Sequence, residues 1–307
     1  SALLLFAFAG ATTYLSGPSG QAVVHGLKLV AVAVVADGVR RMARQLTPDA
    51  PRALLAAAAA AIAVASDTAV VQLAIVAAGA LLGPWVCRSV SAGAGAPIPL
   101  GTGRRTGAVL LAVFGLLLVL ALVAVESDWP PLVQVAAAFY RAGALVFGGG
   151  HVVLPLLQEA VVEPGWVGGE DFLVGYGAAQ AVPGPMFSIA AFLGARLEGA
   201  PGGAIGALVS LLAILLPGLM LAAGVLPWWS SLAGRPGAAR AMAGVNAAVV
   251  GLLGAALYDP VWTSAVLDPW DFATALIGFT LLAATRTSML LVVAWCVGAS
   301  LLRMAVS

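Results

Sequence analysis

Long apolar runs follow one another along almost the whole chain, and they constrain the fold more than any other feature. A helix that crosses a bilayer needs about 20 predominantly apolar residues. The runs predict spans near residues 2–15, 22–44, 52–66, 69–86, 107–125, 202–226, 237–257, 270–284 and 287–304. Several of these runs are short, so neighbouring pairs such as 52–66 and 69–86 are expected to form tight helical hairpins.

The composition places the chain among membrane proteins. Hydrophobic residues occupy 62% of the 307 positions and charged residues 9%, whereas soluble domains carry about 25% charged residues. A soluble fold of this size would leave much of its apolar surface in water. We therefore expect an all-α polytopic membrane protein. The net charge of +1 argues against a broad basic surface for nucleic acid.

Residue types that hold cofactors or metals are scarce in the sequence. The cysteines Cys87 and Cys296 lie far apart among apolar or small residues, which is typical of packed thiols. The two histidines are 126 positions apart and no His/Asp/Glu cluster accompanies them, which argues against a membrane-embedded enzyme such as a lipid-phosphate phosphatase. The sequence contains no nucleotide-binding loop, which argues against primary pumping. We expect no enzyme activity, no cofactor and no metal.

Glycine and proline interrupt the apolar runs in the region 131–200. One break is FGGGHVVLP at 147–155, and the other is PGPMFSIAAFLGA at 183–195. Broken helices at membrane depth are tolerated only where the freed backbone is buried in protein or lines a cavity. Either break alone could be a packing kink. Two breaks in one region favour a polar site, which a non-transporting membrane scaffold would not need.

Each break is followed by the start of a new helical piece, near His151 and after Pro185. The start of a helix presents unpaired N–H groups and the positive end of a dipole, which suits an anion. Glycine also lets an oxyanion approach the backbone closely. Substrate-binding candidates in these segments are Gly148, Gly149, Gly150, His151, Gln180, Gly184, Phe187 and Ser188.

Charged side chains within spans are costly and usually functional. Lys28 is the only lysine in the chain; it either reaches the membrane interface or faces the path of the anion. Arg141 leads into the glycine motif and could grip an oxyanion with two hydrogen bonds, although a place near the membrane edge fits it equally well. Asn246 is the third polar candidate, because it is the equivalent of Lys28 in the internal repeat described below.

Three residues are candidates for proton coupling. Asp37 follows Lys28 by nine residues on what we take as a nearby helix face, so it could neutralise Lys28 or carry a proton. His151 has a side chain suited to proton handling, the alternative being a structural hydrogen bond. Glu159 follows on the same short helix.

Sliding the chain against itself gives one ungapped register, at an offset of 218. Pro18 then falls on Pro236, Gly26 on Gly244, Val32 on Val250 and Pro51 on Pro269. Residues 1–83 and 219–301 therefore appear as repeated units, and Lys28 is the equivalent of Asn246. The second unit has about 86 residues upstream that hold both breaks, so we expect a similar stretch to precede Ser1 in a longer protein.

The charges at the ends of equivalent helices suggest that the two repeats are inverted. The span 22–44 ends near Arg40, Arg41 and Arg44, whereas its counterpart begins near Arg235 and Arg240. Arg-rich short loops face the cytoplasm. Arg286 fits the inverted scheme, and Arg303 does not.

Inverted repeats with broken helices near the membrane midplane are the architecture of secondary transporters. We expect residues 1–85 to be the carboxy-terminal part of the first repeat, 86–106 a polar connector and 107–307 the second repeat.

Several motifs together resemble the chromate ion transporter (CHR) family. They are Phe147–Pro155, Gln180–Phe187 with Ala191–Gly194, and the helix Gly244–Gly251; Gly26–Val35 is similar to the amino-terminal half of the family. The resemblance implies a bacterial inner-membrane transporter that expels chromate, coupled to the proton gradient. Long members have two homologous halves that each open with a glycine-rich motif. The first half here lacks that motif, in agreement with the expected upstream stretch.

The main alternative to chromate export is transport of sulfate or a related oxyanion. Chromate and sulfate are nearly alike in size and charge, so the residues alone leave a sulfate or related oxyanion carrier open. The expected partners are such an oxyanion, protons or another counter-ion, and the lipid bilayer, without nucleic acid. Whether the protein forms a homodimer is left open.

Overall fold

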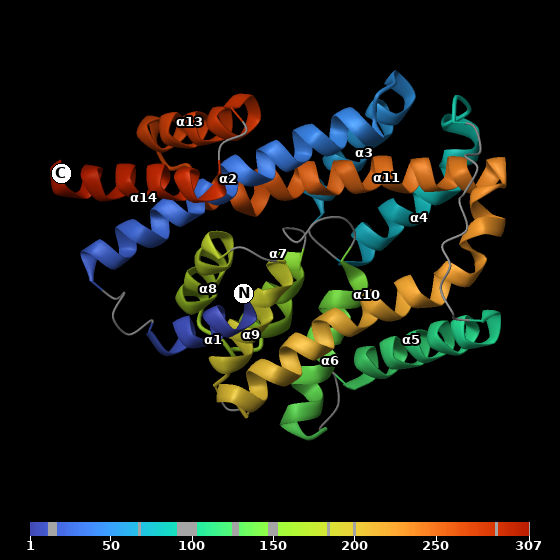
Figure 1. Ribbon diagram of the computed structural model, residues 1–307, viewed down its shortest axis with the longest axis horizontal. Helices are drawn as coiled ribbons and strands as arrows, with labels where there is room; N and C mark the ends of the chain where they lie inside the picture. Colours follow the sequence, from blue (N-terminus) through green and yellow to red (C-terminus); the bar gives the residue numbers. More distant parts are fainter. Residues whose placement is uncertain are drawn as a thin grey trace. The chain divides into compact units, whose positions relative to one another are not determined.

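The structure is a computed structural model that describes residues 1–11, 17–66, 69–90, 103–124, 129–146, 153–182, 185–198, 201–285 and 288–306. Every element in these ranges is helical (Figure 1). Helices α1 to α6 are Ala2–Ala11, Pro18–Leu46, Ala50–Ala65, Ala69–Val86, Arg104–Ala124 and Pro131–Leu145. The interrupted region follows, with α7 (Val153–Leu157), η2 (Gln158–Val162), α8 (Gly169–Ala181), η3 (Met186–Ser188) and α9 (Ile189–Ala195). The last elements are α10 (Gly203–Ala233), α11 (Pro236–Ala256), η4 (Leu257–Trp262), α12 (Thr263–Ala265), α13 (Pro269–Thr285) and α14 (Met289–Val306).

The expected spans agree with these helices within a few residues, with two exceptions. Helix α10 continues to Ala233, seven residues beyond the expected span 202–226, and residues 12–15 of the first expected span lie outside the described ranges. Among the described residues, four helices are long and apolar enough to cross a membrane, namely Pro18–Leu46, Arg104–Ala124, Gly203–Trp229 and Pro236–Ala265. Shorter apolar helices accompany them, among them Ala50–Ala65 and Met289–Ala305. Large apolar side chains such as Leu116 and Leu219 lie exposed on the helix surfaces, as lipid contact requires. The protein is thus an all-α polytopic membrane protein.

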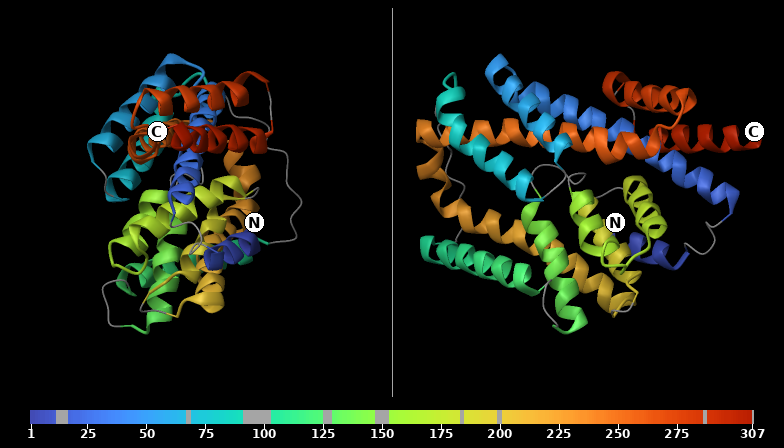
Figure 2. Two further views of the ribbon diagram at one scale, coloured as in Figure 1. Left: turned by 90° about the vertical axis from the view of Figure 1, so that its left-hand side faces the viewer. Right: turned by 180° about the vertical axis from the view of Figure 1, so that it is seen from behind.

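The chain forms two compact units, and each draws on segments from both predicted repeats. Unit 1 comprises Ser1–Arg41, Leu157–Leu211 and Gly254–Ser307. Within it α1 packs on α8 and α9, with the rings of Phe8 and Phe192 6.1 Å apart, and α13 forms a hairpin with α14. Figure 2 shows this hairpin, in red and orange, from two further sides.

Unit 2 comprises Met42–Leu156 and Leu212–Leu253. Its helix α5 packs on α6 through a hydrophobic core that includes Ala121, Ala137 and Tyr140. Helix α3 packs on α4, and Ala59 and Ile75 from this pair meet Ala248 of α11. Of the predicted connector between α4 and α5, residues 91–102 lie outside the described ranges.

Glycine lets helices touch backbone to backbone in both units. A Cβ on Gly26 of α2 would lie 2.6 Å from Cα of Val297 on α14. A Cβ on Gly244 of α11 would lie 2.0 Å from the carbonyl oxygen of Gly79 on α4. Small residues allow such close approach where lipid provides no hydrophobic drive for association. These crossings fix where α2 meets the α13–α14 hairpin and where α11 meets the α3–α4 hairpin.

The two crossings are equivalent under the sequence offset of 218. Adding 218 to positions 26 and 79 gives 244 and 297, so the contact between Gly26 and Val297 becomes the contact between Gly244 and Gly79 with the partners exchanged. A second pair obeys the same rule. Ala33 of α2 meets Gly278 of α13, and its equivalent Gly251 of α11 meets Ala60 of α3. The first helix of each predicted repeat therefore packs on the hairpin of the other.

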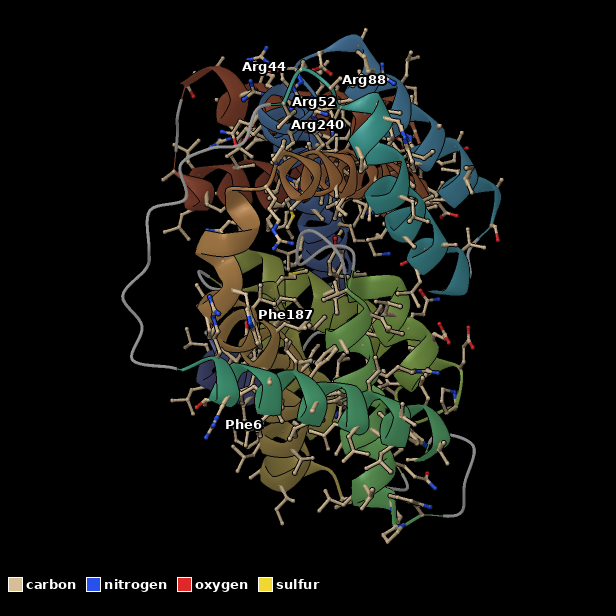
Figure 3. All side chains as sticks on the ribbon, turned by 90° about the vertical axis from the view of Figure 1, so that its right-hand side faces the viewer. Phe6, Arg44, Arg52, Arg88, Phe187 and Arg240 are labelled. Carbon is tan, nitrogen blue, oxygen red and sulfur yellow. The ribbon has the colours of Figure 1, made fainter. Side chains whose placement is uncertain are left out.

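Basic side chains gather at one end of unit 2, where Figure 3 shows Arg44, Arg52, Arg88 and Arg240. Hydrogen bonds join the chain segments there. Arg52 donates to Asp49 at 2.7 Å, the hydroxyl of Ser89 donates to Asp49 at 3.0 Å, and Arg240 Nε donates to the carbonyl of Val90 at 3.4 Å. The start of α3, the segment after α4 and the start of α11 therefore meet at one arginine-rich end.

Asp49 in this cluster gives a pH-dependent prediction for stability. It caps α3 by accepting from the backbone N–H of Arg52 at 3.1 Å, and the side-chain hydrogen bond from Arg52 holds the pKa of Asp49 well below its usual range. Asp49→Ala should cost about 1 kcal/mol, as helix caps do. Because the folded-state pKa is depressed, this stabilisation is present above about pH 4, the ordinary carboxyl pKa, and is lost as the pH falls towards the folded-state value.

Thermal unfolding of detergent-solubilised protein at pH 7 and at pH 3 measures this difference. The difference in unfolding temperature between wild type and Asp49→Ala should be smaller at the lower pH. Glu198→Ala, at an exposed position, serves as the control and should show no such change. A gap of equal size at both pH values would contradict the role of the Asp49 carboxylate.

Candidate functional site

The first predicted break lies between α6 and α7. Helix α6 ends at Leu145, and Val146 is extended (φ −75°, ψ 120°). Gly148, Gly149, Gly150 and His151 lie outside the described residues. The next described helical piece is α7, from Val153, and the chain turns into a π-helix at Gln158. Turns of π-helix are rare in proteins, and those that occur are often at functional sites.

The second predicted break lies between α8 and α9. Helix α8 ends at Ala181 and Val182 is extended, whereas Gly184 lies outside the described residues. Pro185 is extended as well, and the chain then resumes as one 3₁₀ turn that leads into α9. Ser188 is buried in this turn, and its hydroxyl donates to the carbonyl of Pro185 at 2.7 Å.

Close packing holds the second break in unit 1. Gly175 of α8 leaves room for the ring of Phe192 on α9, since a Cβ at Gly175 would lie 2.3 Å from that ring. Gly194 of α9 touches α10, where a Cβ would lie 2.3 Å from the carbonyl oxygen of Gly206. The half-buried Phe187 sits in the 3₁₀ turn between these anchors.

Helix α8 also brings the second break next to the helix of Lys28. A Cβ on Gly177 of α8 would lie 3.0 Å from the Cβ of Leu27 on α2, the residue before the half-buried Lys28. Gln180 follows Gly177 by three positions, which places its backbone one turn further along the same side of α8. Two separately predicted parts of the site are thus on neighbouring helices of unit 1.

Asp37 does not pair with Lys28, which was one of the two roles expected for it; the other role, as a proton carrier, stays a prediction. Asp37 is 5% exposed, and its carboxylate accepts from Arg40 at 2.7 Å and from Arg41 at 2.6 Å. Nine residues of helix also separate Asp37 from Lys28 by about 13 Å along the axis and by half a turn around it. The two basic residues that follow Asp37 on its own helix neutralise it instead.

The remaining candidates lie on three other elements. Arg141 is half-buried on α6, two residues before Gly143, where a Cβ would lie 2.1 Å from the carbonyl oxygen of Ile214 on α10. Asn246 is half-buried on α11, two residues after the Gly244 crossing. Glu159 is half-buried in η2. Arg141 and Asn246 belong to unit 2, and Glu159 to unit 1.

Sequence reasoning missed one polar contact in unit 1. His25 of α2 lies 2.7 Å from the buried carboxylate of Asp271 on α13, although 246 positions separate them. The signal that could have found His25 is its place three residues before Lys28 inside an apolar span. Its partner could not be identified without the packing of α2 on α13.

Comparison with known proteins gives consistent matches. A family model described as chromate transporter matches residues 133–301, which include both interrupted segments. A chromate transport protein of Cupriavidus metallidurans is 31% identical over 157 residues, 51% of this chain and 37% of that protein. A probable chromate transport protein of Synechococcus elongatus is 30% identical over 125 residues, 40% of this chain and 31% of the relative.

A third relative is the uncharacterized transporter YwrB of Bacillus subtilis, which is 39% identical over 116 residues, 35% of this chain and 57% of that protein. The chain therefore spans well under two thirds of the length of each of these relatives. No solved structure matches the chain.

Proposed function

The chain belongs to the chromate transporter family, and from this membership we propose that it is part of a secondary transporter that exports chromate across the bacterial inner membrane, driven by the proton gradient. The observation that carries the proposal is the family match over residues 133–301, because it covers both helix breaks that suit an anion. The same membership places the chain with transporters and not with enzymes.

The proposed anion site uses the two interrupted segments and nearby polar side chains. Backbone amides at Gly148, Gly149, Gly150 and Gly184 would approach the oxyanion closely. The side chains of His151, Gln180 and Ser188 would supply further hydrogen bonds, and Phe187 would border the site. Lys28, Asn246 and Arg141 would add donors and positive charge. The contact of Gly177 with Leu27 supports this proposal for Lys28 and the second break.

We also propose that the two repeats are inverted, with residues 86–106 as the connector between them. The exchanged glycine contacts support the repeat, because both pairs fit the offset of 218. The starts of the helices support the repeat too, because they fit the offset of 218 within two residues. Helices α2, α3 and α4 start at residues 18, 50 and 69, and α11, α13 and α14 start at residues 236, 269 and 289.

Charge supports the inverted orientation. The arginine-rich end of unit 2 joins the end of one first helix, near Arg44, to the start of the other, near Arg240, and the positive-inside rule places this end in the cytoplasm. Arg303, which did not fit the rule, forms ion pairs with Asp268 and Asp271 in unit 1. Its charge is thereby compensated.

Chromate accumulation in cells tests the proposed export. Cells that produce the full-length protein should retain less chromate than cells with an empty vector, and a protonophore should abolish the difference. Chromate also enters cells by routes that sulfate blocks, so a tenfold excess of sulfate outside the cells suppresses this entry. In cells preloaded with chromate, the same comparison then follows efflux alone. Equal efflux with and without the protein would contradict the proposal, and efflux of sulfate in place of chromate would favour the sulfate carrier.

Lys28→Met should weaken binding of the anion. A hydrogen bond to a charged group contributes about 1.5–3 kcal/mol, so the apparent KM for chromate should rise at least about tenfold. The control is Lys28→Arg, which keeps a cation at the position and should retain most of the affinity. Initial rates of chromate flux over a range of concentrations measure the effect. An unchanged apparent KM in Lys28→Met would remove Lys28 from the anion path.

A further inference from the structure

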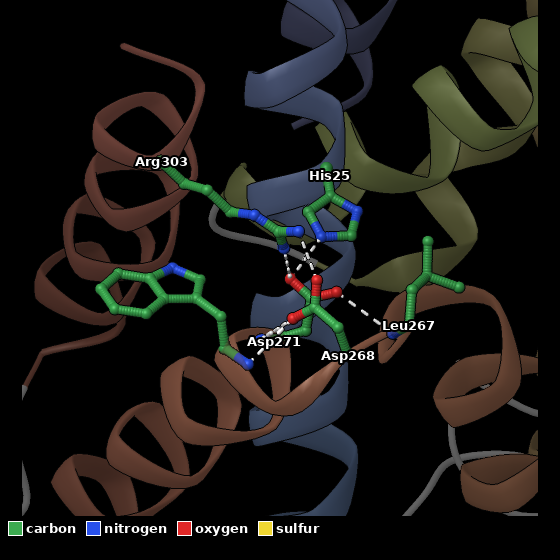
Figure 4. A network of polar contacts seen from close by, with 6 residues as sticks. His25, Leu267, Asp268, Asp271 and Arg303 are labelled. Carbon is green, nitrogen blue, oxygen red and sulfur yellow. Dashed lines mark hydrogen bonds and ion pairs between the residues drawn. The ribbon is translucent and has the colours of Figure 1, made fainter. Parts of the chain in front are cut away.

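A buried carboxylate in unit 1 joins three helices near the start of α2 (Figure 4). Asp271 of α13 is 1% exposed, and its oxygens accept from His25 Nε2 at 2.7 Å, from an Arg303 nitrogen at 3.2 Å and from the backbone N–H of Leu267 at 3.1 Å. Asp268 caps α13 through the N–H of Asp271 at 3.0 Å and pairs with Arg303. We call His25, Asp268, Asp271 and Arg303 the acidic cluster.

The acidic cluster is not needed to hold helices of this kind together. The equivalent positions in the other crossing, at the offset of 218, are Ala243, Ala50, Ala53 and Trp85. That crossing keeps its glycine contacts between α11 and α4 without any of the four polar residues. Burying charge is costly even when it is paired, so the buried Asp271 marks a difference between the two crossings that the packing of the helices does not require.

The charges of the acidic cluster balance only when it binds a proton. Asp268 and Asp271 bring two negative charges and Arg303 brings one positive charge, so the cluster carries one excess negative charge while His25 is neutral. The other ionisable side chains on these elements are Lys28, Asp37, Arg40, Arg41 and Arg44 on α2, the buried thiol of Cys296 on α14, and the exposed Tyr258 and Asp259 of η4. Of these, Lys28 lies one turn along α2 from His25. Imidazole is the side chain that changes charge between about pH 5 and 8.

Two members of the cluster lie at the surface of unit 1. The side chain of His25 is 25% exposed and that of Arg303 is 44% exposed, whereas that of Asp271 is 1% exposed. Helix α2 carries Arg40 and Arg41 towards its far end. The positive-inside rule places these residues towards the cytoplasm, so the start of α2, where His25 lies, faces the extracytoplasmic side.

We propose that His25, held by Asp271, is the proton-binding site that couples transport to the proton gradient, an inference that rests on the proposed function. Nε2–H of the neutral ring donates to Asp271, which leaves Nδ1 as the acceptor. A proton from extracytoplasmic water forms the N–H bond at Nδ1, and the ring becomes a cation that pairs with the Asp271 carboxylate. Loss of the same proton restores the neutral ring. The charge thus changes one turn from Lys28, the proposed anion ligand.

Chromate flux in inverted membrane vesicles tests the coupling with His25→Gln, which keeps a donor for Asp271 but cannot titrate. A gradient of one pH unit can raise accumulation up to about tenfold per proton. Wild type should show this stimulation. In His25→Gln the ratio of chromate accumulation with the gradient to accumulation without it should be about one, while the variant still exchanges chromate for chromate at equal pH. The control Asp259→Asn, at an exposed carboxylate, should keep the stimulation. Full stimulation in His25→Gln would overturn the proposal, as would gradient-independent accumulation by the wild type.

Proton binding can be measured without any substrate. The chain has two histidines, so ¹⁵N spectra of histidine-labelled protein contain few ring signals, and comparison with His25→Gln assigns those of His25. We expect the doubly protonated fraction of the His25 ring, compared at one pH, to be smaller in Asp271→Asn than in wild type, because the carboxylate that would stabilise the imidazolium is lost. A His25 ring that stays neutral in wild type under the conditions of the transport assay would overturn the proposal. If wild type carried no chromate at all, the proposed function would fail, and these spectra would still decide whether the cluster binds a proton.

Discussion

Gly244→Leu is expected to unfold the protein at a much lower temperature than wild type. A Cβ at this position would lie 2.0 Å from the carbonyl oxygen of Gly79 and 2.8 Å from Cα of Gly83, both in the backbone of α4. Overpacking against side chains costs about 1–3 kcal/mol. Because backbone atoms cannot rotate aside as side chains do, we expect the cost to reach or exceed about 3 kcal/mol.

The matched control is Gly254→Leu on the same helix. A Cβ at Gly254 would meet nothing within 4 Å, and removing a glycine from a helix interior is favourable by up to about 1 kcal/mol. Thermal unfolding in detergent, followed by the loss of monodisperse protein, compares the two variants. The equivalent of Gly244 in unit 1 is Gly26, and Gly298→Leu on α14, where a Cβ would meet nothing within 4 Å, is the control for Gly26→Leu. If Gly244→Leu and Gly254→Leu unfolded at the same temperature, the close crossing of α11 and α4 would be wrong.

Gly149→Leu is expected to abolish most chromate transport without preventing insertion. If the glycine motif brings backbone amides up to the oxyanion, a leucine side chain blocks that approach and at least one charge-assisted hydrogen bond is lost. Such bonds contribute about 1.5–3 kcal/mol, so transport at a fixed low chromate concentration should fall at least about tenfold.

The control for this prediction is Gly218→Leu on α10, where a Cβ would meet nothing within 4 Å. Both variants should reach the membrane in similar amounts, which quantitative immunoblotting of the membrane fraction measures. Wild-type rates from a properly inserted Gly149→Leu protein would remove the triple-glycine segment from the anion site.

The helices were largely predictable because the apolar runs and the proline and glycine breaks are local signals. The expected span 22–44 became α2 (Pro18–Leu46), and the breaks fall after Leu145 and Ala181. The offset of 218 was also visible in the sequence. That offset could not reveal that α2 packs on α13 and α14 while α11 packs on α3 and α4, because the exchange depends on contacts between distant segments.

The candidate site was less predictable than the helices, since side-chain partners depend on tertiary packing. Asp37 pairs with its helical neighbours Arg40 and Arg41, a pattern that the spacing of three and four residues could have indicated. The contact between His25 and Asp271 spans 246 positions, and no local signal points to it. Lys28 was identified because a lone lysine in an apolar span stands out in the sequence alone.

Uptake of chromate by inverted inner-membrane vesicles tests the central claim, that this membrane protein moves a divalent oxyanion out of the cell. Vesicles that contain the full-length protein should accumulate labelled chromate above the level of empty vesicles when their interior is acidified, and accumulation should collapse when a protonophore removes the gradient. Equal chromate uptake by vesicles with and without the protein, at matched and confirmed insertion, would contradict the account.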